Sequence, residues 1–322
     1  MGTIKYIRIR EVEFVTLKPE RINISKGINL NLIKIEKFKS NLLSFYFIIP
    51  LNRKNVTKNS LLPLVIKRGT RELNTSLELQ RKLESMYGSD LSIDVNKKGE
   101  KHVIRFTIEA PKGSYVNNQK YMFKIIDLLK SIIYNPYLED EVFSQQYVQQ
   151  EKQNLKRLIE GRINDKRTYA LERCIEEMCE NEKFSLYPLG YIEDLDEINS
   201  RILYEHYNNI VSKAPIEIFY VGEYGDQLID YLTNSFKFER SGILKLEREH
   251  ITGNVQTKNI VYEDMDINQG KLVLGYKTGI PYENSLYNGL LVASDILGGG
   301  PNSKLFRSVR EAESLASYIN SK

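Results

Sequence analysis

The chain of 322 residues is 41% hydrophobic and 27% charged, a balance typical of a soluble globular protein with one or two domains. Its 46 basic and 42 acidic residues leave a net charge of +4, too weak a field to indicate a nucleic-acid partner. No apolar run approaches the roughly 18 residues of a membrane-spanning helix, and no signal-peptide core is visible, so we expect no membrane partner.

The first part of the chain predicts strands followed by a short helix. Runs of β-branched and aromatic residues predict three strands, at 12–17, 28–36 and 41–50. A helix is expected over 60–67, where Pro63 would be tolerable because it would fall in the first turn.

A capping box marks the start of the next helix. The Thr75 hydroxyl and the Glu78 carboxylate are spaced to satisfy each other's free backbone N–H groups, so a helix is expected to begin at Thr75. Residues 91–96 and 102–110 then alternate apolar and polar side chains around a polar turn, which predicts a β-hairpin.

The rest of the chain predicts a helical region and then a second, smaller region of strands and helices. Helices are expected at 117–134, 139–162, 165–180, 195–211 and 226–236, with a buried strand at 216–221. Residues 237–257 are charged and aperiodic, which indicates a linker. Beyond the linker, strands are expected at 259–263, 271–276 and 315–320, and helices at 284–297 and 302–311.

Two stretches, 42–96 and 271–320, repeat the order strand, helix, helix, strand. In both, the first helix stops at a glycine, Gly69 or Gly298, which accepts a left-handed conformation. An order this simple also arises by chance, but it favours a duplicated α+β domain. We therefore predict a first domain over 1–236, a linker over 237–257 and a truncated second domain over 258–322.

The segment from Ile296 to Asn320 reads ILGGGPNSKLFRSVREAESLASYIN. It resembles the second-domain signature of the pitrilysin/insulinase family of zinc peptidases, a pattern near L-G-G-G-x-x-S-x-L-F-x-x-V-R-E-x-x-x-L-A-Y. Weaker matches follow in the family's order at Asn135-Pro136, Tyr187–Gly190 and Leu203–Gly222. The resemblance implies an α+β fold of the pitrilysin type, with helices packed on one face of a mixed or antiparallel sheet.

The family's zinc chemistry depends on an H-x-x-E-H helix, whose imidazoles lie one turn apart and whose Glu activates the metal-bound water. Counting back from the family's Gly-Thr pair, these positions hold Ser60, Pro63 and Leu64, none of which supplies the required ligand or base. A third ligand is expected seven residues after Glu151, where Leu158 stands. The resemblance therefore implies a degenerate site without metal or cofactor.

No other residues form a recognisable hydrolytic site. The histidines lack metal-ligand spacing, and we expect an exposed strand residue at His102, a packed or surface helix residue at His206 and a solvated linker residue at His250. Cys174 and Cys179 lie about 140° apart on one predicted helix, so reduced thiols in a cytoplasmic protein are expected.

The family binds peptides by adding a strand to the edge of its first sheet, a mode that uses backbone hydrogen bonds and needs no zinc. The matching strand here contains Ser92, Ile93, Asp94, Val95 and Asn96. The resemblance implies that these residues bind peptides, and the alternative is an ordinary sheet strand.

A second candidate for peptide contact lies near the C-terminus. Arg310 matches the Arg of an R-x-x-x-x-x-x-Y pair that the family directs to substrate, although Ser317 stands at the Tyr position. The alternative for Arg310 is a surface salt bridge. The turn Gly298, Gly299, Gly300 resembles a short form of the glycine-rich loop in the non-catalytic subunit of mitochondrial processing peptidase, with a helix C-cap as the alternative.

Together these features predict a non-catalytic homologue of a zinc metallopeptidase. We expect it to pair with an active paralogous peptidase subunit and to help bind unstructured peptides. A free-standing peptide-binding or structural homodimer is the alternative, and an active hydrolase with an unrecognised site is a third interpretation.

Overall fold

The computed structural model describes residues 19–116, 118, 120–240, 242–249 and 258–321, so the strand expected at 12–17 lies outside the described residues. The chain forms two compact units. Unit 1 comprises Met1–Glu249 with Ile267–Val273, and unit 2 comprises His250–Asp266 with Leu274–Lys322. No described helix is both long and apolar enough to cross a membrane.

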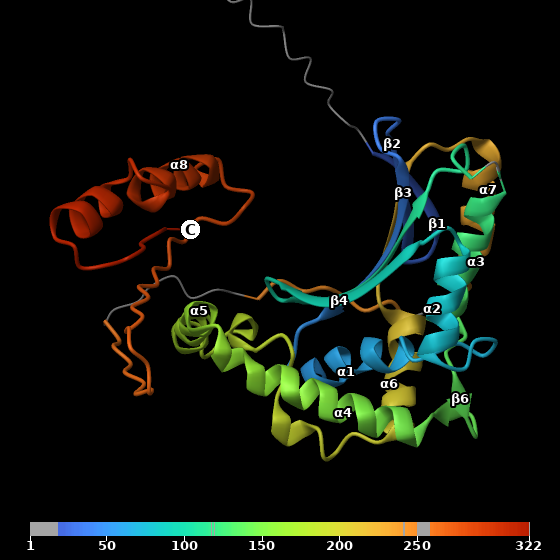
Figure 1. Ribbon diagram of the computed structural model, residues 1–322, viewed down its shortest axis with the longest axis horizontal. Helices are drawn as coiled ribbons and strands as arrows, with labels where there is room; N and C mark the ends of the chain where they lie inside the picture. Colours follow the sequence, from blue (N-terminus) through green and yellow to red (C-terminus); the bar gives the residue numbers. More distant parts are fainter. Residues whose placement is uncertain (1–18, 117, 119, 241, 250–257, 322) are drawn as a thin grey trace, which may run out of the picture. The chain divides into compact units, whose positions relative to one another are not determined.

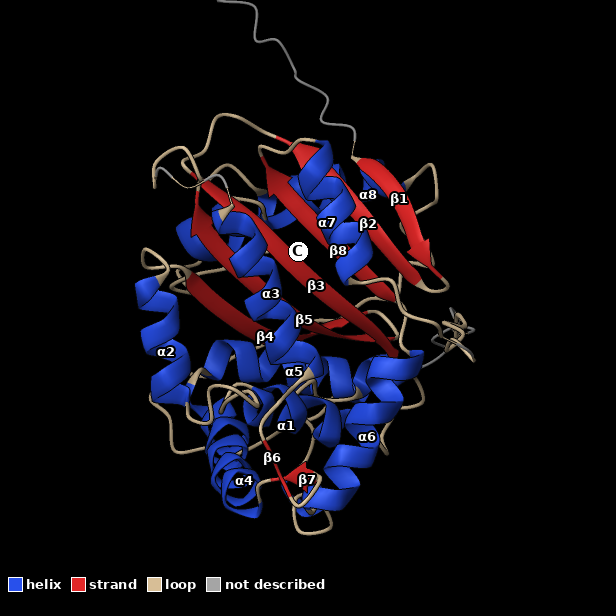
Figure 2. Ribbon diagram, turned by 90° about the vertical axis from the view of Figure 1, so that its right-hand side faces the viewer, coloured by secondary structure: helices blue, strands red, loops and turns tan. Residues whose placement is uncertain are grey.

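Unit 1 is built on a six-stranded sheet with the order β1-β2-β8-β3-β5-β4 (Figure 2). The strands are β1 Glu20–Ser25, β2 Ile28–Lys34, β3 Ser40–Pro50, β4 Asp90–Lys98, β5 Lys101–Pro111 and β8 Ile216–Gly222. β2 and β8 pair in parallel, and the other neighbouring pairs are antiparallel. The sheet is therefore mixed, with β1 and β4 at its two edges.

Helices cover one face of this sheet (Figure 1). They are α1 Val56–Ile66, α2 Ser76–Ser85, α3 Tyr121–Tyr134, α4 Gln145–Glu160, α5 Lys166–Met178, α6 Ser200–Lys213 and α7 Asp226–Ser235. Shorter elements are the hairpin β6 Leu138–Glu139 with β7 Val142–Phe143 and the 3-10 turns Gly161–Asn164, Lys183–Ser185 and Ile192–Asp194. α1, α3 and α6 contact the sheet directly, while α4 packs on α1 and α7 on α3.

The alternation of side chains along β3 explains this layering. Leu43, Phe45, Phe47 and Ile49 point toward the helices and are buried, each contributing about 2 kcal/mol through loss of apolar surface. Phe45 also meets Phe236, at the end of α7, edge to face with 4.5 Å between ring centroids. The residues between them on β3 face the other way and are mostly half-buried.

Two local predictions from the sequence are confirmed. Glu78 N donates to Thr75 Oγ1 and Thr75 N donates to Glu78 Oε2, both at 3.2 Å, which completes the capping box of α2. The hairpin is formed by β4 and β5 with Lys98 opposite Lys101. Both features depend on residues close together in the chain.

The predicted start of α1 was wrong. The helix begins at Val56 rather than at 60, so Pro63 lies in its interior and not in its first turn. A proline there removes one helical hydrogen bond, which usually destabilises a helix by about 3 kcal/mol. The apolar residues Leu61, Leu62 and Val65 around it are buried in the core, and this packing keeps the helix formed.

The described residues of 237–249, within the predicted linker, have no helix or strand and pack against the rest of unit 1. Arg240 donates to the carbonyls of Val211, Ser212 and Ala214 at 2.6 to 3.1 Å, and Leu244 N donates to Lys213 O at 2.9 Å. These carbonyls end α6 and have no partners within the helix. The segment therefore acts as the cap of α6.

Unit 2 contains α8 Tyr287–Gly298 and a short π-helix, Phe306–Ala312. The strands predicted at 259–263, 271–276 and 315–320 were wrong, since the described residues there form no strand. Their apolar side chains are exposed, for example Tyr262 at 87% and Leu272 at 84%. A strand forms by pairing with a neighbouring strand, and no described strand pairs with these segments.

Candidate functional site

The three degenerate positions on α1 lie in a closed part of the structure. The Ser60 side chain is buried, and its hydroxyl donates to the carbonyl of Pro188 at 2.7 Å. Pro63 is buried, and Leu64 is partly buried against the core. A metal ligand needs an accessible lone pair, so these positions present no metal-binding surface.

The loop 187–191 covers the start of α1. Tyr191 N donates to Thr57 Oγ1 at 3.0 Å, and the Thr57 hydroxyl donates to Asp194. Gly190 has a φ of +83°, and a Cβ there would lie 2.5 Å from the Cα of Thr57. Only glycine fits both the backbone conformation and this close approach.

The last degenerate position, Leu158, lies on α4, where its side chain is 47% exposed. Two turns earlier, Glu151 is 2.6 Å from Arg68 Nε in an ion pair, and its second oxygen accepts from Asn154 Nδ2 at 2.9 Å. Arg68 Nη2 also donates to Gln150 Oε1 at 2.6 Å. Both carboxylate oxygens of Glu151, the acidic residue that remains at the site, thus interact with side chains of the same chain.

The two described histidines lie close to the same helix, joined by one amide. Asn59 Nδ2 is 3.0 Å from His102 Nδ1, and Asn59 Oδ1 is 2.7 Å from His206 Nε2. The amide oxygen can only accept, so His206 carries its proton on Nε2 while His102 Nδ1 accepts. Burial lowers the pKa of both histidines to about 4.

The expectation of an exposed His102 was wrong. Even-numbered residues of β5 point toward the helices, and His102 shares this face with Ile104 and Phe106, so it is fully buried. His206 is packed, as one of its two expected placements has it. His250 lies outside the described residues.

The described part of the chain contains no recognisable set of residues for metal binding or for nucleophilic catalysis. No three His, Cys, Asp or Glu side chains there lie close enough to hold a metal ion. Cys174 is a free thiol, and burial raises its pKa, which disfavours the reactive thiolate.

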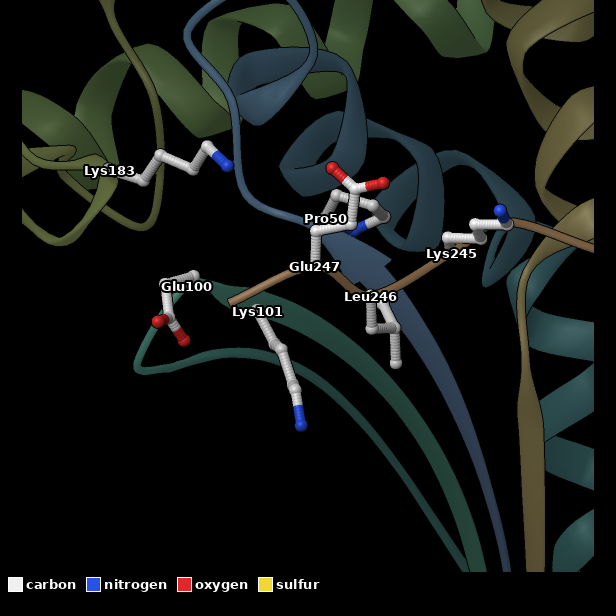
Figure 3. A pocket seen from close by; sticks show the side chains of 7 residues that line it. All are labelled: Pro50, Glu100, Lys101, Lys183, Lys245, Leu246 and Glu247. Carbon is white, nitrogen blue, oxygen red and sulfur yellow. The ribbon is translucent and has the colours of Figure 1, made fainter. Parts of the chain in front are cut away.

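A small hollow of about 110 Å³ lies at the end of the sheet where β3, the β4–β5 turn and the segment 245–247 meet (Figure 3). Its lining consists of Pro50, Glu100, Lys101, Lys183, Lys245, Leu246 and Glu247. Figure 3 shows the three lysine side chains pointing in different directions. The hollow therefore has no converging set of charges for an anion.

The predicted peptide-binding strand is β4, an edge of the sheet. β5 pairs with one side of it, and no described strand pairs with the other. Near its end, Lys97 Nζ donates to the carbonyls of Phe184 and Leu186, at 2.6 and 3.0 Å. The backbone of the segment from Ser92 to Asn96 is thus available on one side among the described residues.

The other predicted peptide contacts lie in unit 2. Gly298 ends α8, and Gly299 N donates to Asp295 O at 2.8 Å, as in a helix cap. Gly300 follows directly, and a Cβ on it would meet no atom within 4 Å. Arg310 places its guanidinium over the Phe306 ring, 4.6 Å from the centroid.

Sequence comparison places these features among known proteins. A family profile described as "Peptidase M16 inactive domain" matches residues 197–322. The chain is 38% identical over 298 residues to "Probable inactive metalloprotease YmfF" of Bacillus subtilis strain 168. That alignment covers 92% of this chain and 70% of the relative.

Solved structures agree with this comparison. A conserved protein from Enterococcus faecalis V583 superposes with a TM-score of 0.78 at 28% identity, over 93% of this chain and 71% of that one. A peptidase M16 inactive domain from Pseudomonas fluorescens superposes with a TM-score of 0.68 at 14% identity, over 94% of this chain and 70% of that one. The second likeness shows the fold alone.

Proposed function

We propose that this chain, which belongs to the M16 peptidase family as a homologue of the inactive type, is the non-catalytic, peptide-binding partner of an active peptidase subunit. The observation that supports this role best is the combination of a closed catalytic helix with an open sheet edge. Ser60 is buried under the Pro188 carbonyl, whereas no described strand pairs with the outer side of β4.

Backbone pairing at β4 does not depend on a metal ion. A strand added to a sheet edge gains affinity from main-chain hydrogen bonds, and pockets for alternate side chains give it specificity. Loss of the zinc ligands removes cleavage but leaves such an edge intact. The residues proposed for this contact are Ser92, Ile93, Asp94, Val95 and Asn96.

Residues of unit 2 are proposed to contribute to the same role. The guanidinium of Arg310 can form paired hydrogen bonds with a peptide carbonyl or carboxylate. Within the turn Gly298, Gly299, Gly300, a peptide backbone could approach Gly300 closely, because a Cβ there would meet no atom within 4 Å. The space beside Gly298 and Gly299 is taken up by Ser321 and Asp295.

The partner is proposed to be an active paralogue that carries the H-x-x-E-H helix. Exposed apolar residues in unit 2 support association with another chain, because monomers rarely expose so many. They include Val261, Tyr262, Leu274, Tyr276, Leu286, Leu291, Val292, Ile296 and Leu315. The same observation favours a second candidate, a homodimer that binds peptides without a peptidase partner. The free thiol of Cys174 supports a cytoplasmic location for either assembly.

The test mixes the purified chain with a paralogue of the same organism that carries H-x-x-E-H. Light scattering coupled to size exclusion is expected to show a 1:1 complex, and a labelled unstructured peptide is expected to bind it more tightly than the paralogue alone. A homodimer that binds the peptide would instead favour the second candidate. The proposal fails if the chain neither binds the peptide nor associates with the paralogue.

A further inference from the structure

The two faces of the edge strand β4 differ in chemistry. Leu91 is buried in the core, and Ile93 and Val95, which point to the same side, are partly buried against it. Asp94 and Asn96 point to the opposite side of the sheet. The strand therefore presents one apolar and one polar face.

The polar face is already occupied by charge. The Asp94 carboxylate receives Arg105 Nε at 2.7 Å and Arg105 Nη2 at 2.5 Å, and its other oxygen accepts from Asn96. Arg105 lies opposite Asp94 on β5. A second carboxylate beside Asp94 would lie near a like charge with no donor reserved for it.

A peptide that pairs with β4 would have apolar and polar neighbours on β4 at alternate residues. Side chains directly opposite on neighbouring antiparallel strands lie about 5 Å apart, and successive residues point to opposite faces. Every second peptide residue would thus lie beside Ile93 or Val95, and the intervening ones beside Ser92, Asp94 or Asn96. The contact with the carbonyls of Phe184 and Leu186 holds the Lys97 side chain and marks the end of the open stretch.

We infer that β4 selects extended peptides whose apolar side chains recur at every second residue, with polar, non-acidic residues between them. This inference rests on the proposed function, because it names the peptide class that the same edge would take. The open stretch from Leu91 to Asn96 would engage about 20 Å of extended chain, or roughly six residues.

The experiment compares five labelled eight-residue peptides on the full chain by fluorescence anisotropy. The first alternates valine and threonine, the second groups the same residues into an apolar and a polar block, and the third replaces the threonines by glutamate. The fourth and fifth repeat the first with N-methyl groups, on the valine amides in one and on the threonine amides in the other. The alternating peptide should bind about tenfold more tightly than the blocked and acidic ones. Only one of these two methylated peptides should lose binding.

Two variants test whether the preference for the alternating peptide arises at β4. Val95→Thr keeps the shape of the side chain and should remove most of the preference for the alternating peptide. Ile22→Thr also introduces a hydroxyl in place of an apolar group, with the loss of one further carbon, on β1 at the opposite edge of the sheet, and should leave the preference unchanged. Equal binding of the alternating, blocked and acidic peptides would overturn this inference while leaving peptide binding itself intact. Absence of binding by every peptide would instead overturn the peptide-binding part of the proposed function, and this inference with it.

Discussion

Arg68 Nε lies 2.6 Å from the carboxylate of Glu151, and this ion pair joins the turn after α1 to α4. The Glu151 side chain is only 9% exposed, so its charge requires a partner. The positions that would hold zinc ligands carry Ser60, Leu64 and Leu158 instead. The ion pair therefore holds the two helices of the degenerate site together without a metal ion.

Replacing Arg68 by alanine should lower the free energy of unfolding by about 2–3 kcal/mol, because it leaves a nearly buried carboxylate without its cation. Arg68 is partly exposed, which keeps the expected loss below that of a fully buried pair. Urea denaturation measures it. The double variant Arg68→Met with Glu151→Leu should recover most of the loss, and a single-variant loss under about 0.5 kcal/mol would contradict this role.

The purified chain should contain no stoichiometric zinc and cleave no unstructured peptide, because the four functional positions hold Ser60, Pro63, Leu64 and Leu158. Restoring a site is expected to need all four of Ser60→His, Pro63→Glu, Leu64→His and Leu158→Glu. Elemental analysis and a peptidase assay check this. About one zinc per unmodified chain would show that the alignment is wrong.

Ser60→His alone should also destabilise the fold, by about 1–3 kcal/mol. The buried hydroxyl lies against the Pro188 carbonyl, and an imidazole would overpack this space. Thermal or urea unfolding measures the effect. Lys67→His, at the exposed position that ends α1, is the matched control and should change stability little.

Stability should fall on acidification between about pH 6.5 and pH 4. Burial lowers the pKa of His102 and His206 to about 4, and Lys97 and Lys58 respectively add to the shift. Both histidines are thus neutral in the folded state, while the unfolded chain binds protons below about pH 6.5. Their stabilising effect is complete above that pH and is lost as the pH falls toward 4, by up to about 3 kcal/mol per histidine. The urea midpoint should change less steeply with pH in the variant His206→Gln than in the unmodified chain. An equally steep change would show that His206 does not cause the loss of stability.

Gly190→Ala should destabilise the chain by about 3 kcal/mol or more, since it combines a positive φ with a close approach to Thr57. Gly88→Ala separates the two causes. Gly88 has a φ of +69°, but a Cβ on it would meet no atom within 4 Å, so only the backbone cost of about 1 kcal/mol is expected. Equal losses for both variants would show that the contact between Gly190 and Thr57 is unimportant.

The full chain should dimerise, swap segments or aggregate through residues 258–322, whose apolar side chains are exposed. A version ending at Glu249 should be more monomeric. A cut at Phe236 would instead remove Arg240 and Leu244, which cap α6. Light scattering at tens of micromolar compares the full chain with the version that ends at Glu249. A purely monomeric full chain would contradict the prediction that residues 258–322 drive association.

Local features of the fold could be predicted from the sequence alone. The capping box of Thr75 and Glu78 and the β4–β5 hairpin depend on residues only a few positions apart, so spacing is sufficient to identify them. The family and its inactive type were also accessible, because they depend on which residues occupy a few positions. Neither required knowledge of distant contacts.

Other features were decided by tertiary structure. The interior Pro63 of α1, the burial of His102 and the missing strands in 258–322 all contradict local patterns. Core packing keeps α1 helical despite its proline, and the register of β5 turns His102 toward Asn59. The strand-like segments beyond residue 258 pair with no described strand and therefore form no sheet. Residue identity and spacing thus specify the local elements and the loss of the zinc ligands, whereas burial and strand pairing depend on residues far apart in the chain.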